Sequence, residues 1–359
     1  MKRSPPLALV ASVLLRLAAQ ARVPADSALP PFTPQGAVPA PLLIARTAST
    51  STLADAWISA FRRFHPEARV RQTDASTDLP AKSLAELVAH EVDLAPFVRE
   101  IQPQELASAR QALGADLLGV AIATGSYATP SNTHAIAVYV NASNPLPGLT
   151  LAQLDAIYSA TRRRGLPARL ETWGQLGLTG PWAQRPIHPY GMVIERKVGN
   201  PHAGIVAYLM ERVMQGGAFD PRTLQVPDTG MGRGNNRALD EIADAVAKDP
   251  EGIGYSGFAN AVPGVRAVPL AETEDGPFYA GTESEVAARV YPLTRTIFAY
   301  ARPLGNDPKA AALREFLRFV LSREGQEAVA ADQARFLPLP EAFARGERRR
   351  VEAPLTGSP

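Results

Sequence analysis

Short apolar runs alternate with amphipathic helical patterns along most of this chain, and no other feature limits its fold as strongly. Runs typical of buried strands cover 117–123, 136–140 and 253–255. Helical patterns lie before, between and after them, at 83–90, 103–113, 150–160, 203–215, 236–248 and 309–321. Strands that alternate with helices of this length indicate an α/β architecture, in which helices cover the faces of the sheets.

Two strand-like segments are suited to cross between domains. One is Thr133–Asn141, which leads into a loop containing Asn and Pro, and the other is Tyr291–Tyr300. A chain that crosses twice builds one of its domains from both of its ends. We therefore predict one lobe from 42–135 plus 290–345 and a second lobe from 136–289. A cleft between two such lobes is a favoured place for a ligand.

A hydroxyl-rich turn stands near the start of the first lobe. After a short apolar run, six residues rich in Ser and Thr (47–52) lead into a helical pattern with Leu53, Trp57 and Phe61 on one face. Thr52 is suited to cap this helix, with Asp55 three residues later. Free N–H groups and the positive dipole end at such a helix start favour an anion. The same residues also cap helices that bind no ligand, so the residues alone leave both interpretations open.

Both ends of the chain are predicted to lie outside the lobes. Residues 1–21 have the layout of a signal peptide, with a basic start, an apolar run over 7–19 and small residues at its end, although a disordered leader is the alternative. Removing this segment takes away three basic residues and changes the formal net charge from +2 to −1. Residues 22–41 are predicted to be an irregular leader, and 346–359 a flexible tail. No other segment is long and apolar enough to span a membrane.

Composition excludes several classes of function. The chain has no Cys, so disulfides and thiolate chemistry are excluded. Its five His residues show no metal-ligand spacing, so we expect no metal site and no cofactor. The dense basic runs 162–164 and 348–350 have no interleaved aromatic residues, which favours a solvated loop and tail over nucleic-acid binding. No nucleophile and base stand in a recognisable arrangement, so we expect no enzyme.

Several segments, taken in order, resemble the periplasmic phosphate-binding proteins of ABC importers. They are 47–49 before a helix that carries Trp57, then 91–95, 135–141, 149–158, 173–174, 234–236, 252–255, 291–293 and 316–317. The resemblance spans about 42–340 and implies a two-lobed type II binding fold. Each lobe would be a helix-covered mixed sheet, with the ligand cleft between the lobes.

The resemblance also implies an anion site. In that family, hydroxyls and backbone N–H groups from several loops hold the anion together with an Arg, and such charge-assisted bonds are strong. Carried over, the first loop is Thr47, Ala48 and Ser49. The second is Lys82 and Ser83, at the predicted start of the helix 83–90. Arg99 follows as the candidate counter-charge.

This chain departs from the family pattern at three places. Val98 stands where the family often has Ser or Asp, and His134 replaces an Asp before the crossing strand. The Ser-Gly-Thr-Arg segment of the second lobe is absent, and residues 199–204 stand in its place. His134, His202, Lys82 or Arg196 would then be donors to a different anion.

The sequence therefore predicts an exported, monomeric solute-binding protein. Its ligand would be phosphate or a related oxyanion, its partners the permease subunits of an ABC importer, and closure of the lobes its mechanism. The alternative is a binding-fold protein that has lost transport and acts as an anion sensor or interaction module.

Overall fold

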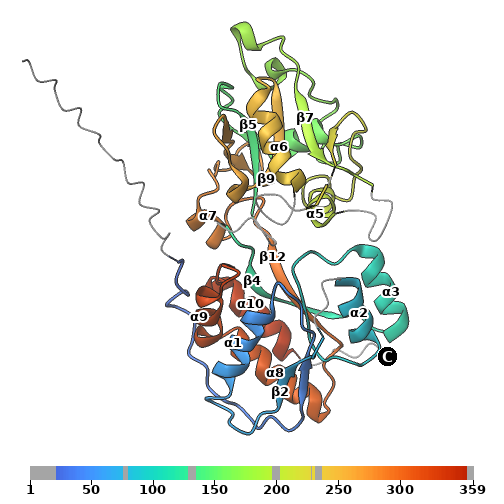
Figure 1. The fold of residues 1–359 in the computed structure, drawn as a ribbon, viewed down its shortest axis with the longest axis vertical. Coiled ribbons are helices and arrows are strands. Elements are labelled where there is room, and N and C mark those ends of the chain that lie inside the picture. Colours follow the sequence, from blue (N-terminus) through green and yellow to red (C-terminus); the bar gives the residue numbers. More distant parts are fainter. Residues whose placement is uncertain are drawn as a thin grey trace, which may run out of the picture.

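The computed structural model describes residues 22–75, 80–127, 135–195, 203–227, 229–230 and 237–353. In Figure 1, elements from both ends of the chain form the lower part of the molecule, and elements from its middle form the upper part. We call these parts the lower lobe and the upper lobe.

The lower lobe holds a mixed sheet and most of the helices. Its strands are β1 (Leu42–Ile44), β2 (Val70–Gln72), β3 (Ala95–Phe97), β4 (Leu118–Thr124) and β12 (Thr296–Ala301). Its helices are α1 (Ser51–Phe61), α2 (Pro80–Val88), α3 (Pro103–Leu113), α8 (Pro308–Val320), α9 (Arg323–Ala331) and α10 (Glu341–Glu352). β1 pairs with β2 in parallel, and β12 pairs antiparallel with both β3 and β4. A parallel bridge between Ile44 and Leu94 joins the two groups, so the strand order is β2-β1-β3-β12-β4.

The upper lobe holds a five-stranded sheet. Its strands are β5 (Ile136–Asn141), β7 (His188–Met192), β8 (Leu224–Val226), β9 (Gly252–Gly257) and β10 (Val265–Ala267), with a separate pair β6 (Leu149–Thr150) and β11 (Leu270–Ala271). Its helices are α4 (Leu151–Tyr158), α5 (Gly204–Arg212), α6 (Arg237–Lys248) and α7 (Glu283–Ala287). The order is β8-β7-β9-β5-β10, with β7 parallel to β8 and β9, and β5 antiparallel to β9 and β10.

The two sheets share one plan. Reading β2-β1-β3-β12-β4 against β8-β7-β9-β5-β10, each position has the same strand direction relative to its neighbours. In each sheet the fourth strand is the first strand after the chain has come from the other lobe. β5 follows β4 of the lower lobe, and β12 follows α7 of the upper lobe. The predicted α/β architecture with helix-covered mixed sheets is confirmed.

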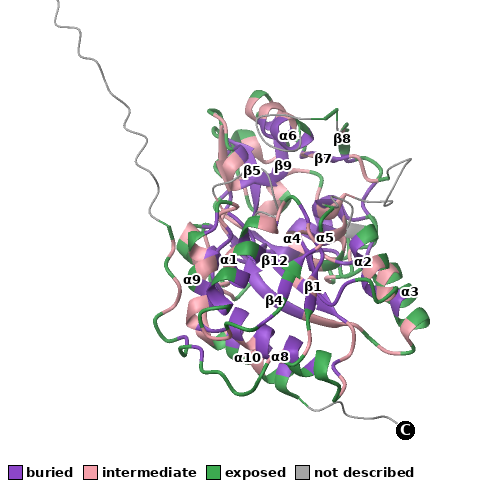
Figure 2. Cartoon of the chain, turned by 60° about the horizontal axis from the view of Figure 1, so that its bottom comes forward, coloured by how far each residue is buried: buried purple, intermediate pink, exposed green. Residues whose placement is uncertain are grey.

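Each lobe has its own apolar core. The lower core gathers Trp57, Phe61, Phe316 and Phe319, all at most 1% exposed, beneath the strands β4 and β12. The upper core includes Trp173, Tyr255 and Tyr291 and also excludes solvent. Figure 2 shows these central strands buried and the outer turns exposed. Burying such side chains stabilises each lobe by about 1.5–3 kcal/mol per large residue.

Helix starts differ from the sequence expectation at two places. Helix α1 begins at Ser51 with Thr50 as its N-cap, so Thr52 does not cap it, and the Thr52 hydroxyl donates to Asp332 Oδ1 at 2.7 Å. Helix α2 begins at Pro80, because proline is well suited to the first turn, and Ser83 therefore lies inside the helix. The capping box at Thr150 and Gln153 is confirmed in both directions, at 2.9 and 3.1 Å.

Residues 22–41 and 346–352, which were predicted to lie outside the lobes, pack against the lower lobe more closely than expected. Residues 22–41 have no helix and no strand, but Leu29 and Phe32 are buried, and the Phe32 ring lies 5.3 Å from that of Phe319. Helix α10 continues to Glu352 with Val351 buried, so the tail predicted from 346 is helical over 346–352. The predicted signal peptide lies outside the described residues. Within the described part of the chain, no helix combines the length and apolarity needed to cross a bilayer.

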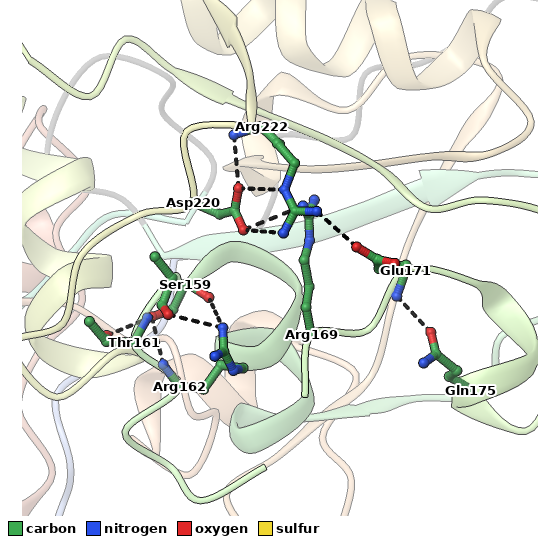
Figure 3. Close-up of polar contacts among 9 residues, drawn as sticks. Ser159, Thr161, Arg162, Arg169, Glu171, Gln175, Asp220 and Arg222 are labelled. Atoms are coloured by element: carbon green, nitrogen blue, oxygen red, sulfur yellow. Dashed lines mark hydrogen bonds and ion pairs between the residues drawn. The ribbon is translucent and has the colours of Figure 1, made fainter. Parts of the chain in front are cut away.

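The basic run 162–164 is not a freely solvated loop. The backbone N–H of Arg162 donates to Ser159 Oγ at 3.1 Å, and Arg164 donates to the carbonyl oxygens of Val213 and Arg212, both at 2.6 Å. Beside it, buried Asp220 accepts hydrogen bonds from Arg222 and pairs with Arg169 at 3.3 Å (Figure 3). These arginines thus hold the ends of α4 and α5 and the turn before β8 together.

Candidate anion-binding site

The two segments that connect the lobes lie side by side. Gly125 N donates to Arg295 O at 2.9 Å, and Ile136 N donates to Leu293 O at 3.3 Å. The buried Tyr291 hydroxyl donates to Ile136 O at 2.9 Å, which ties the end of one crossing to the start of the other. Two crossings bonded to each other leave the lobes joined through a narrow connection.

Arg289 fastens this connection to the lower lobe. Its guanidinium donates to the Thr124 hydroxyl at 3.0 Å and to the Thr296 hydroxyl at 2.7 Å, so one side chain holds the end of β4 and the start of β12. The guanidinium also lies 4.0 Å from the centre of the Phe343 ring on α10, a favourable cation–π distance. Arg289 has a φ of 60°, which is uncommon for a residue with a side chain.

The first predicted loop forms a closed turn before α1. The Thr47 hydroxyl lies 2.7 Å from the Thr50 hydroxyl, and Ser51 N donates to Thr47 O at 3.0 Å. Thr47 is buried, Ala48 exposed and Ser49 half-buried. The N-cap residue Thr50 makes no side-chain capping bond to the first turn of α1. The helix start is thus not closed by its own cap, which suits a ligand that accepts N–H groups.

The start of α5 in the upper lobe is also uncapped. Its N-cap residue is Ala203, which has no polar side chain, and the helix begins at Gly204. A Cβ placed on Gly204 would lie 3.1 Å from Arg99 Cβ and 3.5 Å from Arg295 Nη2. The structure therefore brings two arginines, one from the lower lobe and one from the crossing, directly against this helix start.

Arg99 is bound to a carboxylate of the lower lobe. Its two terminal nitrogens donate to Glu105 at 2.7 and 2.6 Å, and Nη1 also donates to Glu100 O at 2.9 Å. Glu105 in turn accepts from Gln102 N at 2.9 Å, completing a capping box at the start of α3. Arg99 thus braces the entry to α3, and a contact of Arg99 with an anion remains a prediction.

Arg295 is the second arginine at this place, and the sequence did not single it out. It is 4% exposed and donates to both Glu100 oxygens, at 3.1 and 2.5 Å. Its guanidinium lies 5.3 Å from the centre of the Tyr208 ring on α5, and the Tyr208 hydroxyl donates to Thr294 O at 3.0 Å. Arg295 therefore contacts both lobes and the connection between them.

The pKa of Glu105 reflects this network. Burial acts to raise it, but the hydrogen bonds from Arg99 and from Gln102 N lower it by more, so the pKa lies below its ordinary value of 4.5. Glu105 is therefore ionised at neutral pH, and its charge offsets that of Arg99. At this helix start each arginine is therefore paired with one carboxylate, Arg99 with Glu105 and Arg295 with Glu100.

The second predicted loop is placed differently from the expectation. Because α2 begins at Pro80, Ser83 is not at the helix start and cannot cap it. Ser83 is 1% exposed, and its hydroxyl has no hydrogen-bond partner among the described residues. The Lys82 side chain is 55% exposed and pairs with Glu86 at 3.7 Å on the same helix. A role of either residue in binding remains a prediction.

Three further candidates cannot be placed. His134, His202 and Arg196 lie outside the described residues.

Sequence signals existed for the two residues of this network that the sequence analysis did not single out, Glu105 and Arg295. Glu105 follows Gln102 by three positions with Pro103 between them, which is the pattern of a helix start. Arg295 is the only basic residue in the predicted crossing Tyr291–Tyr300.

Comparison with known proteins defines the class and then the family. A family model described as a PBP superfamily domain matches residues 33–324. The chain is 30% identical over 323 residues to the phosphate-binding protein PstS from two strains of Pseudomonas aeruginosa, with 90% of each chain covered. Among solved structures, PstS from Borrelia burgdorferi superposes with a TM-score of 0.52 at 15% identity, over 83% of this chain and 98% of that one.

The matching fold and the two sheets of one plan define a two-lobed binding protein of type II. Within that class, the chain belongs to the family of the phosphate-binding protein PstS.

Proposed function

We propose that this chain is an extracytoplasmic solute-binding protein that captures phosphate, or a closely related oxyanion, for an ABC importer. The observation that carries the proposal is the family membership over nine-tenths of the chain. The uncapped starts of α1 and α5 support it, because backbone N–H groups there are suited to an oxyanion.

The proposed site combines three parts. The Thr47–Ser49 turn and the start of α1 supply hydroxyl and N–H donors from the lower lobe. The start of α5 supplies N–H donors from the upper lobe. Arg99 and Arg295 supply positive charge between them, offset by Glu105 and Glu100 when no ligand is bound. His134 and His202 are further proposed donors, and the roles proposed for Lys82 and Ser83 are secondary.

The protein acts by binding and closure, without covalent chemistry. An anion held between the lobes contacts both, so it favours the closed arrangement, and the narrow connection allows the lobes to move as units. We propose that the protein is an exported monomer, released by cleavage after Ala21, and that its partners are permease subunits. The alternative of a sensor without transport is not favoured by the family membership.

A thermal-shift screen of oxyanions on the purified chain tests the ligand. A ligand that binds only the native state raises the apparent melting temperature. Phosphate is expected to raise it more than sulfate or nitrate at equal concentration. If phosphate left the melting temperature unchanged and another solute clearly raised it, that solute would be the ligand and phosphate would not.

Mass spectrometry of the periplasmic fraction tests export. The mature chain is expected to begin at Arg22, because Ala19 and Ala21 are the small residues before the cleavage point. An intact Met1 on protein confined to the cytoplasm would contradict the proposed location.

A further inference from the structure

Three metal-ligating side chains meet at one end of the upper sheet. His188 opens β7, whereas Asp249 and Glu251 lie in the turn between α6 and β9. The parallel pairing of β7 and β9 places His188 opposite Gly252, and His188 N donates to Glu251 O at 3.0 Å. The fold therefore brings together residues that are 61 positions apart, which explains why the spacing of His residues in the sequence gave no sign of them.

The three side chains converge closely. His188 Nδ1 lies 2.8 Å from Asp249 Oδ2, and the ligand atoms of all three residues lie within 4.8 Å of one another. Zinc binds nitrogen and oxygen ligands at about 2.0–2.2 Å, so tetrahedral ligand atoms lie roughly 3.4 Å apart. Side-chain shifts on the order of 1 Å would bring this set to that geometry.

Asp249 is held in place by groups other than His188. The Tyr190 hydroxyl donates to Asp249 Oδ2 at 3.0 Å, and Glu251 N donates to Asp249 Oδ1 at 3.0 Å. A carboxylate oriented in this way is a fixed ligand, and such supporting hydrogen bonds strengthen metal sites.

The charges of the side chains around the cluster are compatible with a bound cation. Arg185 is the basic side chain that pairs with it, with Nη1 3.6 Å from Glu251 Oε1, and its guanidinium is held 4.5 Å from the centre of the Trp182 ring. The two carboxylates carry one more charge than the single guanidinium offsets. The side chains of His188, Asp249 and Glu251 are 41%, 17% and 24% exposed, so an ion can enter and water can complete its coordination.

We propose that His188, Asp249 and Glu251 form a three-ligand site for a divalent transition metal of the Zn²⁺ class. One imidazole and two carboxylates suit such a borderline ion, with water in the remaining position. The metal takes the place of the hydrogen bond between His188 Nδ1 and Asp249 Oδ2, and it ties the start of β7 to the turn before β9. The proposal is independent of anion binding between the lobes.

The test is a zinc titration of the untagged, chelator-treated protein in phosphate-free buffer, followed by calorimetry and by thermal unfolding. We expect one Zn²⁺ per chain and a higher melting temperature, with no shift from Mg²⁺. His188→Ala should weaken zinc binding at least tenfold. Tyr190→Phe, which removes only the hydroxyl that orients Asp249, should weaken it by about tenfold.

His90→Ala is the matched control, because His90 is exposed in the lower lobe. It should bind zinc as the wild type does. If His188→Ala does not fold in the presence of chelator, His188→Gln gives the same comparison with a similar volume. A wild-type protein that takes up no zinc, or equal zinc affinity in the His188 and His90 variants, would overturn the proposal.

Discussion

At the level of single residues, Arg99 and Glu105 hold the entry to α3 through a two-point contact between guanidinium and carboxylate. Both side chains are largely buried, at 10% and 14% exposure, so the pair is only weakly screened by solvent. The family resemblance implies that Arg99 is a counter-charge for an anion, which stays a prediction, and the structure shows that Arg99 also braces α3 through Glu105. A mutation can separate the two roles.

Arg99→Ala is expected to lower the free energy of unfolding by about 1.5–3 kcal/mol, the range for a hydrogen bond to a charged group. The reason is that Glu105 loses its partner while remaining largely buried. Urea unfolding measures the loss, and phosphate titration of the folded variant measures affinity. Unchanged stability with strongly reduced affinity would show that Arg99 serves the ligand and not α3.

Glu105 should also make stability depend on pH. Its pKa is lower in the folded protein than its ordinary value of 4.5, so ionised Glu105 stabilises the fold above that value. This contribution is lost as the pH falls from 4.5 through the folded-state pKa. Glu105→Gln should therefore be less stable than the wild type at neutral pH and lose less stability on acidification. Urea unfolding over this pH range measures the free energy of unfolding of both proteins. An equal pH dependence of this free energy in the two proteins would contradict the role assigned to Glu105.

At the level of elements, the start of α1 is the part of the proposed site whose local structure the sequence predicted best. The hydroxyl-rich turn and the helix after it were both predicted, because apolar periodicity and Ser/Thr clusters are local signals. The predicted N-cap, Thr52, was wrong by two residues, because α1 begins at Ser51 and Thr50 is its N-cap. The predicted start of α2 at Ser83 was also wrong. The helix begins at Pro80, because proline is well suited to the first turn of a helix.

Ser49→Ala should weaken phosphate binding by about 1–3 kcal/mol, because the ligand loses one hydroxyl while the N–H groups of α1 remain. Thr52→Ala, three residues later in the first turn of α1, is the matched control. Its hydroxyl donates to Asp332, so its loss should lower stability and leave affinity unchanged. Calorimetric titration of both variants makes the comparison. Wild-type affinity in Ser49→Ala, or reduced affinity in Thr52→Ala, would argue against the proposed turn.

The cap of α4 offers a test of the fold that is independent of the ligand. The Thr150 hydroxyl accepts from Gln153 N, and Gln153 accepts from Thr150 N. Thr150→Ala should lower the free energy of unfolding by about 1 kcal/mol. Thermal or urea unfolding measures this loss. A stability equal to that of the wild type would mean that the cap does not contribute to the free energy of unfolding.

At the level of the whole molecule, elements from both ends of the chain form the lower lobe, and elements from its middle form the upper lobe. The lobe bounds and the two crossings expected from the sequence stay predictions. The contacts across the connection could not be predicted, because Arg289, Arg295 and Tyr208 meet partners that are distant in the sequence. The meeting of His188 with Asp249 likewise depends on strand pairing, which single-sequence patterns do not define.

Phosphate should draw the lobes together. Small-angle scattering is expected to give a smaller radius of gyration with saturating phosphate than without it, because a ligand that contacts both lobes favours the closed arrangement. The control is Ser49→Ala measured at a phosphate concentration below its own dissociation constant, where no compaction is expected. An unchanged radius in wild-type protein that demonstrably binds phosphate would mean that the lobes are already closed.

The most direct test of the account is a calorimetric titration of phosphate into the purified mature chain, from which bound ligand has been removed by partial unfolding and refolding. The account predicts saturable binding of one phosphate per chain, with sulfate a much weaker competitor. No heat of binding and no competition from phosphate, in protein that has refolded cooperatively, would contradict the assignment of this chain as a phosphate-binding receptor.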